Sequence, residues 1–297
     1  HRRARIAPGV RAGWARGIFG RTGRRLVARL LAPHATSIGA QPKGRRGPPG
    51  VVAPVSLDAR NLSYSAARIR TMPPTGPPTG RATTIAVGIE TTPKKCFASA
   101  FDWPGWSRSG RDPDAALAAL AGYAERYRPV TEAAGYPLPE RFVLRERERL
   151  TGGATTAFGA PEVIFEADRA PVTGPQAKRL AALVAAAWEY FDEVVAASPE
   201  ALRKGPRGGG RDRDKMIMHV LGAENSYARS IGIKVPEPAL GDLEAIEAQR
   251  LAIAAVLGER SDGGPVAPGK KWTARYAARR IAWHVLDHAW EMEDRRP

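Results

Sequence analysis

The chain has 297 residues, which is enough for one large domain or two domains of ordinary size. Its formal net charge of +16 suggests a nucleic-acid partner, but the first 80 residues hold 15 of the 46 lysines and arginines and only one of the 30 acids. The other 217 residues therefore carry 31 basic and 29 acidic side chains. A nearly neutral remainder lacks the basic surface that binds phosphate, so we expect no nucleic-acid binding by the folded part.

The single cysteine, Cys96, excludes an intrachain disulfide and fits a reducing compartment. No apolar run approaches the roughly 20 residues that a membrane-spanning helix needs. We therefore expect a cytoplasmic protein without a membrane span. Cys96 alternates with alanines in a predicted strand, so we expect a packed side chain and not a nucleophile.

Residues 1–82 are rich in arginine, glycine, proline and alanine, with little hydrophobic periodicity. We interpret them as a disordered basic tail or as a non-native extension, because this composition buries too little apolar surface to fold. A short basic amphipathic helix over residues 18–31, like those of transit peptides or membrane-surface segments, stays open as an alternative. Met72 is a candidate true start, because the sequence begins with histidine and GC-rich DNA encodes this composition in almost any frame.

Residues 83–170 predict an α+β domain, a small antiparallel sheet with one helix. Its expected strands are apolar or alternating runs separated by turns, at residues 84–90, 95–101, 106–109, 140–150 and 162–166. Asp112, Pro113 and Asp114 form a typical helix start, with an N-cap acid, a first-turn proline and a second acid near the positive end of the helix dipole. The helix is expected over residues 115–127, and a linker over 168–173.

Two strands, the corner Asp102-Trp-Pro-Gly-Trp106 and an Ala/Leu-rich helix resemble the HicB-like module, over about residues 83–130. HicB antitoxins usually add a DNA-binding segment, and we find no helix-turn-helix or basic equivalent in this sequence. We therefore interpret this half as a scaffold without chemistry of its own.

Residues 174–297 predict an all-α four-helix bundle, because four amphipathic stretches of helical length follow one another. The expected helices cover residues 176–197, 212–231, 240–257 and 276–295. The Gly/Arg-rich stretch 204–210 lacks the Lys-Ser/Thr ending of a phosphate-binding loop and has no strand before it. We interpret it as a connection and not as a nucleotide site.

Three of the five histidines fall in this bundle, and the other two lie in the N-terminal tail. His284 and His288 stand four residues apart, so they share one face of the last helix with Ile281 and Met292. Two imidazoles at this spacing can chelate one metal ion. His219 lies on the second helix, and three histidines from two helices match the ligand number of a catalytic metal site that keeps one position for water.

Two segments of the predicted bundle resemble characteristic segments of the DinB/YfiT-like helical bundles. The first, His219-Val-Leu-Gly-Ala-Glu-Asn-Ser-Tyr, resembles the family's His-Leu-x-x-Ala-Glu segment, and the second, Ala282-Trp-His-Val-Leu-Asp-His-Ala-Trp, resembles its His-x-x-x-His segment. The resemblance covers about residues 174–295. It implies that His219, His284 and His288 bind a divalent metal, with zinc, nickel and manganese all precedented. The chain departs from the family after His288, where it reads Ala289-Trp-Glu-Met-Glu-Asp in place of a His-x-Gly-Gln-like continuation.

The same resemblance implies a metal-dependent transferase or hydrolase acting on a small-molecule substrate. One possibility is an S-transferase that uses a low-molecular-weight thiol such as mycothiol or bacillithiol. The metal would then bind and deprotonate a thiol or a water molecule. Glu224, five residues after His219, is the predicted general base or partner of the site.

The alternative is a non-catalytic regulatory or protein-interaction protein that joins a HicB-like module to a metal-binding or metal-free bundle. A homodimer is compatible with both. We interpret Asp287 and Glu291 as ordinary surface charges. Three tryptophans are interpreted as core or dimer packing: Trp188, Trp283 and Trp290.

Overall fold

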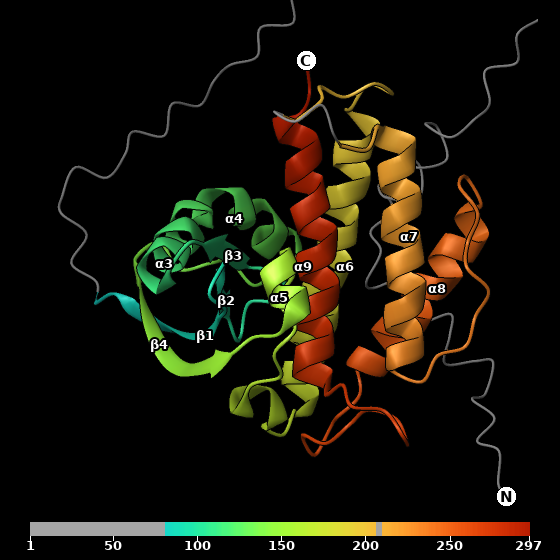
Figure 1. The fold of residues 1–297 in the computed structure, drawn as a ribbon. Coiled ribbons are helices and arrows are strands. Elements are labelled where there is room, and N and C mark those ends of the chain that lie inside the picture. Colours follow the sequence, from blue (N-terminus) through green and yellow to red (C-terminus); the bar gives the residue numbers. More distant parts are fainter. Residues whose placement is uncertain (1–80, 206–209) are drawn as a thin grey trace, which may run out of the picture. The chain divides into compact units, whose positions relative to one another are not determined.

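A computed structural model describes residues 81–205 and 210–297. The predicted fold class is confirmed in these residues, because a small sheet with helices precedes a helical bundle (Figure 1). The predicted tail and the candidate start at Met72 lie outside the described residues. None of the helices in the described part is long and apolar enough to cross a membrane.

The sheet has four strands in the order β3-β2-β1-β4. They are β1 (Thr83–Thr91), β2 (Cys96–Ala100), β3 (Ser107–Gly110) and β4 (Phe142–Thr151). The first three pair antiparallel, as predicted, whereas β4 runs parallel to β1, so the sheet is mixed. The long helical connection between β3 and β4 explains this difference, because a parallel neighbour requires such a crossover.

The single helix predicted over residues 115–127 is two helices, α3 (Pro113–Gly122) and α4 (Ala124–Ala133). Asp112 caps α3 as expected, and its Oδ1 accepts a hydrogen bond from the Ala115 N–H at 2.8 Å. The break follows Gly122, a residue of low helix propensity, and places Tyr123 at φ −92° and ψ 2°.

The strand predicted over residues 162–166 is wrong, because this segment is irregular apart from the first residue of a short 3-10 helix. The backbone N–H groups of Glu162 and Val163 donate to the buried Glu90 carboxylate of β1, at 3.0 and 2.9 Å. This carboxylate takes the place of a neighbouring strand as the hydrogen-bond acceptor. Burial raises the pKa of Glu90, and these hydrogen bonds oppose that shift.

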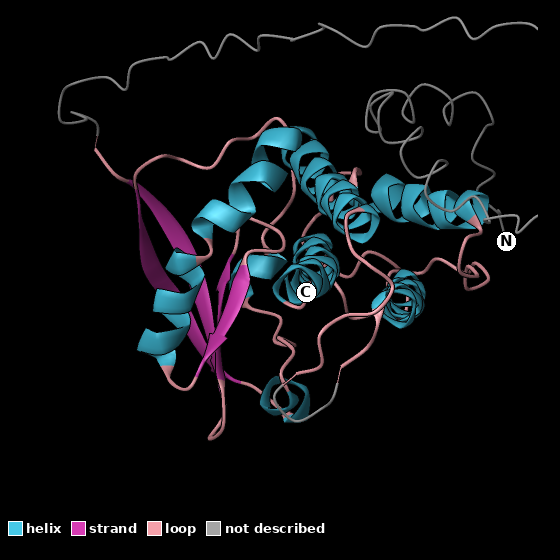
Figure 2. Ribbon diagram, turned by 90° about the horizontal axis from the view of Figure 1, so that it is seen from above, coloured by secondary structure: helices cyan, strands magenta, loops and turns pink. Residues whose placement is uncertain are grey.

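The four predicted helices of the bundle are confirmed, with ends shifted by a few residues. They are α6 (Gly174–Ala196), α7 (Arg213–Ser230), α8 (Leu243–Leu257) and α9 (Ala274–Asp294). Helix α9 packs against α6, α7 and α8, and α8 also packs against α6 and α7 (Figures 1 and 2). Two short helices, α5 (Ala154–Phe158) and the 3-10 helix η1 (Glu166–Arg169), connect β4 to α6.

The sheet and the bundle meet along α9, and Ala82–Pro297 lie in one compact unit. Trp283 of α9 meets Phe97 of β2 edge to face, with ring centroids 6.0 Å apart. Gly105 lies against α9 so closely that a Cβ there would stand 2.6 Å from Leu286 Cδ1. The sheet and the bundle thus share one packed unit, and the predicted boundary between two domains at residues 170–174 stays a prediction.

The Asp102–Trp106 corner is held by buried aromatic side chains. The Trp106 indole N–H donates to the Leu120 carbonyl at 2.8 Å, and the Tyr127 hydroxyl donates to the Pro104 carbonyl at 2.7 Å. The Trp106 and Tyr127 rings are stacked with their centroids 5.7 Å apart. These contacts hold Gly105 at φ +94°, in the backbone region that favours glycine.

A buried ion pair ties the predicted linker to α9. Arg279 donates to Asp168 of η1 through two nitrogens, at 3.0 and 2.5 Å, and the two side chains are only 3% and 1% exposed. Removing one member of such a pair leaves an uncompensated buried charge, which costs about 3–5 kcal/mol.

We therefore expect Asp168→Ala to lower the free energy of unfolding by about 3–5 kcal/mol in urea denaturation. The matched control is Glu166→Ala in the same 3-10 helix, whose side chain is 85% exposed and forms only a long ion pair. That control should change stability by less than about 0.5 kcal/mol. Equal effects of the two substitutions would show that the buried pair does not hold η1 to α9.

Candidate metal centre

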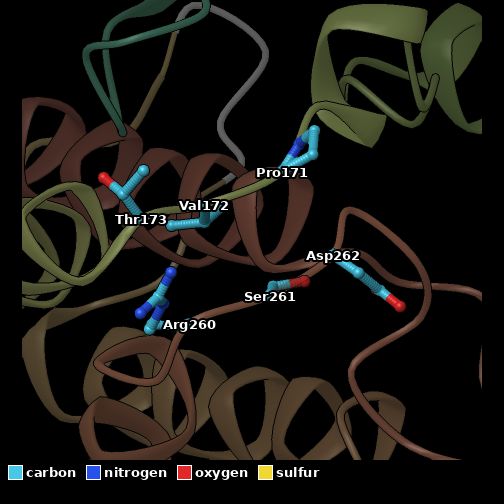
Figure 3. A pocket seen from close by; sticks show the side chains of 6 residues that line it. All are labelled: Pro171, Val172, Thr173, Arg260, Ser261 and Asp262. Carbon is cyan, nitrogen blue, oxygen red and sulfur yellow. The ribbon is translucent and has the colours of Figure 1, made fainter.

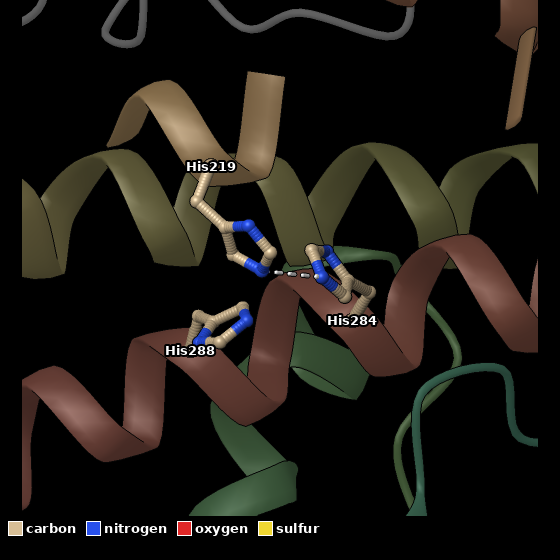
Figure 4. Close-up of side chains that lie close together, drawn as sticks. All are labelled: His219, His284 and His288. Carbon is tan, nitrogen blue, oxygen red and sulfur yellow. Dashed lines mark hydrogen bonds between the residues drawn. The ribbon is translucent and has the colours of Figure 1, made fainter. Parts of the chain in front are cut away.

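Three histidines from two neighbouring helices form the candidate metal centre. Helix α9 carries His284 and His288 one turn apart, and α7 carries His219 opposite them (Figure 4). All three lie well inside their helices, where the backbone is fixed by hydrogen bonds in both directions. Thr273 caps the start of α9 by accepting a hydrogen bond from the Tyr276 N–H.

The ring nitrogens converge on one point. One ligand nitrogen from each histidine lies within 4.8 Å of the other two. The Nε2 atoms of His284 and His219 are 3.3 Å apart. Two nitrogens that bind one tetrahedral ion at 2.0–2.1 Å would lie about 3.3–3.4 Å apart, so this pair already has the required separation.

His219 and His284 are both held in the neutral form that binds metals. The side chain of His284 is buried, which lowers its pKa well below 6.5, and the charges of His288 and His219 act in the same direction. Burial also lowers the pKa of His219 to about 4, with smaller contributions from His288 and Arg211. In the metal-free protein one ring donates its proton to the other across the 3.3 Å contact.

Glu291 has a role that the sequence interpretation missed. Its Oε2 lies 3.0 Å from His288 Nδ1, which leaves Nε2 of that ring free to face the other histidines. This hydrogen bond is the main reason why the pKa of Glu291 is lowered, and Arg295 contributes through a second contact at 3.0 Å. A carboxylate that orients a ligand histidine is a common partner in metal sites. The interpretation of Glu291 as an ordinary surface charge is therefore wrong.

Asp287 also differs from the expected free surface charge. Its carboxylate accepts a hydrogen bond from Arg108 of β3 at 2.8 Å. The Arg108 guanidinium lies over the Tyr123 ring, 3.9 Å from its centroid. The residue next to His288 is thus anchored to the sheet.

Glu224, the predicted catalytic residue, is not among the residues whose ligand atoms lie together. Its side chain is fully buried, and its Oε2 lies 3.5 Å from Arg250 Nε on α8. Arg250 also pairs with Asp192 of α6 at 2.8 Å. Burial raises the pKa of Glu224 in spite of the arginine. The general-base role of Glu224 stays a prediction.

The remaining predicted packing residues are buried. Trp188, Trp283 and Trp290 are at most 4% exposed and belong to the packed interior. Cys96 is buried within β2, and burial raises the pKa of its thiol, which disfavours the reactive thiolate.

A separate surface pocket of about 320 Å³ lies where the segment before α6 meets the segment after α8 (Figure 3). Val172 and Ser261 exchange two backbone hydrogen bonds there, at 2.8 and 3.1 Å. The six lining residues include no histidine: Pro171, Val172, Thr173, Arg260, Ser261 and Asp262. The pocket therefore does not contain the metal centre.

No protein-family model, curated protein or solved structure matches this chain. The resemblances to the HicB-like module and to the DinB/YfiT-like bundles stay predictions for this reason. What the centre does has to be inferred from its own geometry.

We expect Glu291→Gln to weaken divalent-metal binding about 10- to 100-fold, because the carboxylate that orients His288 is lost while the three ligands remain. Isothermal titration with Zn²⁺ would measure the change. Glu293→Gln is the matched control on the same helix, since Glu293 contacts Arg126 and Tyr190 and no histidine. Unchanged affinity in both variants would contradict the role assigned to Glu291.

The metal-free protein should lose stability as the pH falls from about 6.5 toward 4. Unfolded His219 takes up a proton near 6.5 and the folded form only near 4, so in this window the unfolded state binds more protons. Above the window both forms are neutral and this contribution is constant. Urea denaturation between these pH values should show a weaker pH dependence for His219→Gln than for the unsubstituted protein. Equal slopes would contradict the low pKa.

Proposed function

We propose that this chain is a divalent-metal-dependent enzyme whose ion is held by His219, His284 and His288. The observation that carries the proposal is the convergence of three imidazoles, two of them with Nε2 atoms 3.3 Å apart. Three protein ligands leave a fourth position in a tetrahedral site, and a substrate atom or water occupies that position in catalytic centres. Imidazole ligands suit zinc and nickel well.

The bound metal would lower the pKa of a thiol or a water molecule at the fourth position. In a thiol transfer, a metal held by the three histidines would favour the thiolate, with the thiol proton released to solvent, and the thiolate would attack an electrophilic carbon. A carbon–sulfur bond forms as the bond to the leaving group breaks. We favour a low-molecular-weight thiol such as mycothiol or bacillithiol as the co-substrate, because the histidine segments resemble those of DinB/YfiT-like transferases. Hydrolysis by a metal-bound hydroxide is the second reaction compatible with the same centre.

The surroundings of the centre support a catalytic site more than a structural one. Structural zinc sites usually have four protein ligands, and only three ligand residues are grouped in the described part of the chain. The bundle also has its own buried apolar core, so we expect it to fold without the metal.

The test is metal content together with turnover. The purified chain should bind one Zn²⁺ or Ni²⁺ ion. The substitution His284→Ala should weaken this metal affinity by a factor on the order of 100 or more, while the far-UV circular dichroism spectrum stays the same. His34→Ala is the matched control, because this histidine is not one of the predicted ligands. The metal-loaded protein should transfer mycothiol or bacillithiol to an alkyl halide, and His284→Ala should abolish the reaction.

Three outcomes separate the alternatives. Turnover of an ester or amide without thiol transfer would favour the hydrolase. Tight metal binding with neither reaction would favour the regulatory or protein-interaction alternative. Equal metal affinity of His284→Ala and the unsubstituted chain would remove the centre altogether.

A further inference from the structure

Arg280 is an unusual arginine on α9. Two other arginines of this helix pair with carboxylates, Arg275 with Asp102 at 3.1 Å and Arg279 with Asp168 at 2.5 Å. The Arg280 guanidinium forms a hydrogen bond with the Tyr227 side chain, but its Nη1 is buried without a hydrogen-bond partner. Leaving a buried charged donor without an acceptor is unfavourable, so such an atom suggests a missing ligand.

A second donor without a partner lies one turn along the same face. His284 Nδ1 is buried and has no hydrogen-bond partner, while His284 Nε2 faces His219. If Nε2 binds the metal, the proton of the neutral ring must be on Nδ1, which makes Nδ1 a donor. Residues four apart on a helix are neighbours, so the two orphan donors come from adjacent positions beside the centre.

Aromatic rings restrict where the Arg280 guanidinium lies. Its Cζ is 4.8 Å from the Trp283 ring centroid and 5.4 Å from that of Tyr227 on α7. The Tyr227 ring in turn meets the His284 ring edge to face, with centroids 5.6 Å apart. The Tyr227 ring therefore contacts both the Arg280 guanidinium and the His284 ring.

The charge around the centre is positive. Arg280 and Arg211 both lie close enough to His284 to lower its pKa. The Glu291 carboxylate at the centre is already shared between His288 and Arg295. A divalent ion would add two further charges, so an anionic ligand is favoured electrostatically.

We propose that Arg280 and the Nδ1–H of His284 form a subsite for a carboxylate of the substrate, next to the metal. A carboxylate has one negative charge and two acceptor oxygens, which match the charge of one guanidinium and the two unsatisfied donors, Arg280 Nη1 and His284 Nδ1. The thiol or water on the metal and the carboxylate at this subsite would belong to the same reaction site. This inference rests on the proposed function, since the metal fixes the tautomer of His284.

The test uses Co²⁺ as a visible substitute for the metal. Its visible absorption reports metal binding, and a thiolate-to-cobalt absorption band reports binding of a thiol probe. The probes are 3-mercaptopropionate and 3-mercaptopropionamide, which differ only in the carboxylate. We expect the carboxylate probe to bind at least about tenfold more tightly. In Arg280→Gln this preference should disappear while Co²⁺ affinity is unchanged.

Two control variants sharpen the result. Arg147→Gln makes the same change at an exposed arginine of β4 and should keep the full preference. Arg280→Lys keeps the charge and should keep part of the preference, and it replaces Arg280→Gln if that variant does not fold. Equal binding of the two probes to the unsubstituted protein, or an unchanged preference in Arg280→Gln, would overturn the subsite.

A metal-independent measurement separates failure of the subsite from failure of the centre. Propionate at constant ionic strength should raise the melting temperature of the unsubstituted metal-free protein more than propionamide does, and this difference should be absent in Arg280→Gln. If Co²⁺ does not bind but this difference is found, the proposed metal function fails and only the Arg280 part of the carboxylate subsite stands. If Co²⁺ binds and propionate has no such effect with or without the metal, the subsite fails and the centre stands.

Discussion

The constraint on which the rest of the structure depends is the burial of α9 on nearly all sides. The helix is covered by the other three helices of the bundle and by the sheet, yet it carries histidines, arginines and acids along its length. Every polar group that it brings into the interior needs a partner, because an unsatisfied one destabilises the fold. Most partners come from elements far away in the sequence, such as Asp168 for Arg279 and Arg108 for Asp287. The helix thereby determines how the sheet, the 3-10 helix and the bundle meet.

This constraint separates ordinary polar contacts from the candidate centre. Arg279 and Asp168 satisfy each other and leave nothing for a ligand. His219 and His284, in contrast, place their Nε2 atoms 3.3 Å apart, where either a shared proton or a shared ion can bridge the two nitrogens. Buried neutral imidazoles in this arrangement are poor acid–base groups near neutral pH but good metal ligands. The chemistry therefore follows from where the bundle places these rings.

Much of this arrangement was predictable from the sequence, because its signals are local. The capping of α3 by Asp112, the lengths of the bundle helices and the shared face of His284 and His288 all depend on residues a few positions apart. The irregular segment at 162–165 was not predictable in this way, since its N–H groups are bound by Glu90 from a distant strand. The parallel pairing of β4 also depends on a long crossover whose direction no local pattern records.

The residues of the candidate metal centre also differ in how far the sequence alone could predict them. The convergence of His219 on the other two histidines could be expected from a resemblance and a bundle hypothesis. The contact between Glu291 and His288 was available from their spacing of three residues, although that spacing is equally common among surface charges. The unsatisfied Nη1 of Arg280 could only be seen in three dimensions, because its neighbour Arg279 has the same sequence surroundings but pairs with Asp168.

The close approach of Gly105 to α9 has a mechanical consequence. A Cβ at Gly105 would meet Leu286 Cδ1 at 2.6 Å and Ala282 Cβ at 3.1 Å, so the corner touches the helix on both sides of His284 in sequence. Successive residues of a helix are separated by about 100° of rotation around its axis. Turning α9 by a single residue would drive a different side chain into the corner and would swing both of its histidines away from α7. The glycine thus acts as a rotational stop that holds the helix in one angular register.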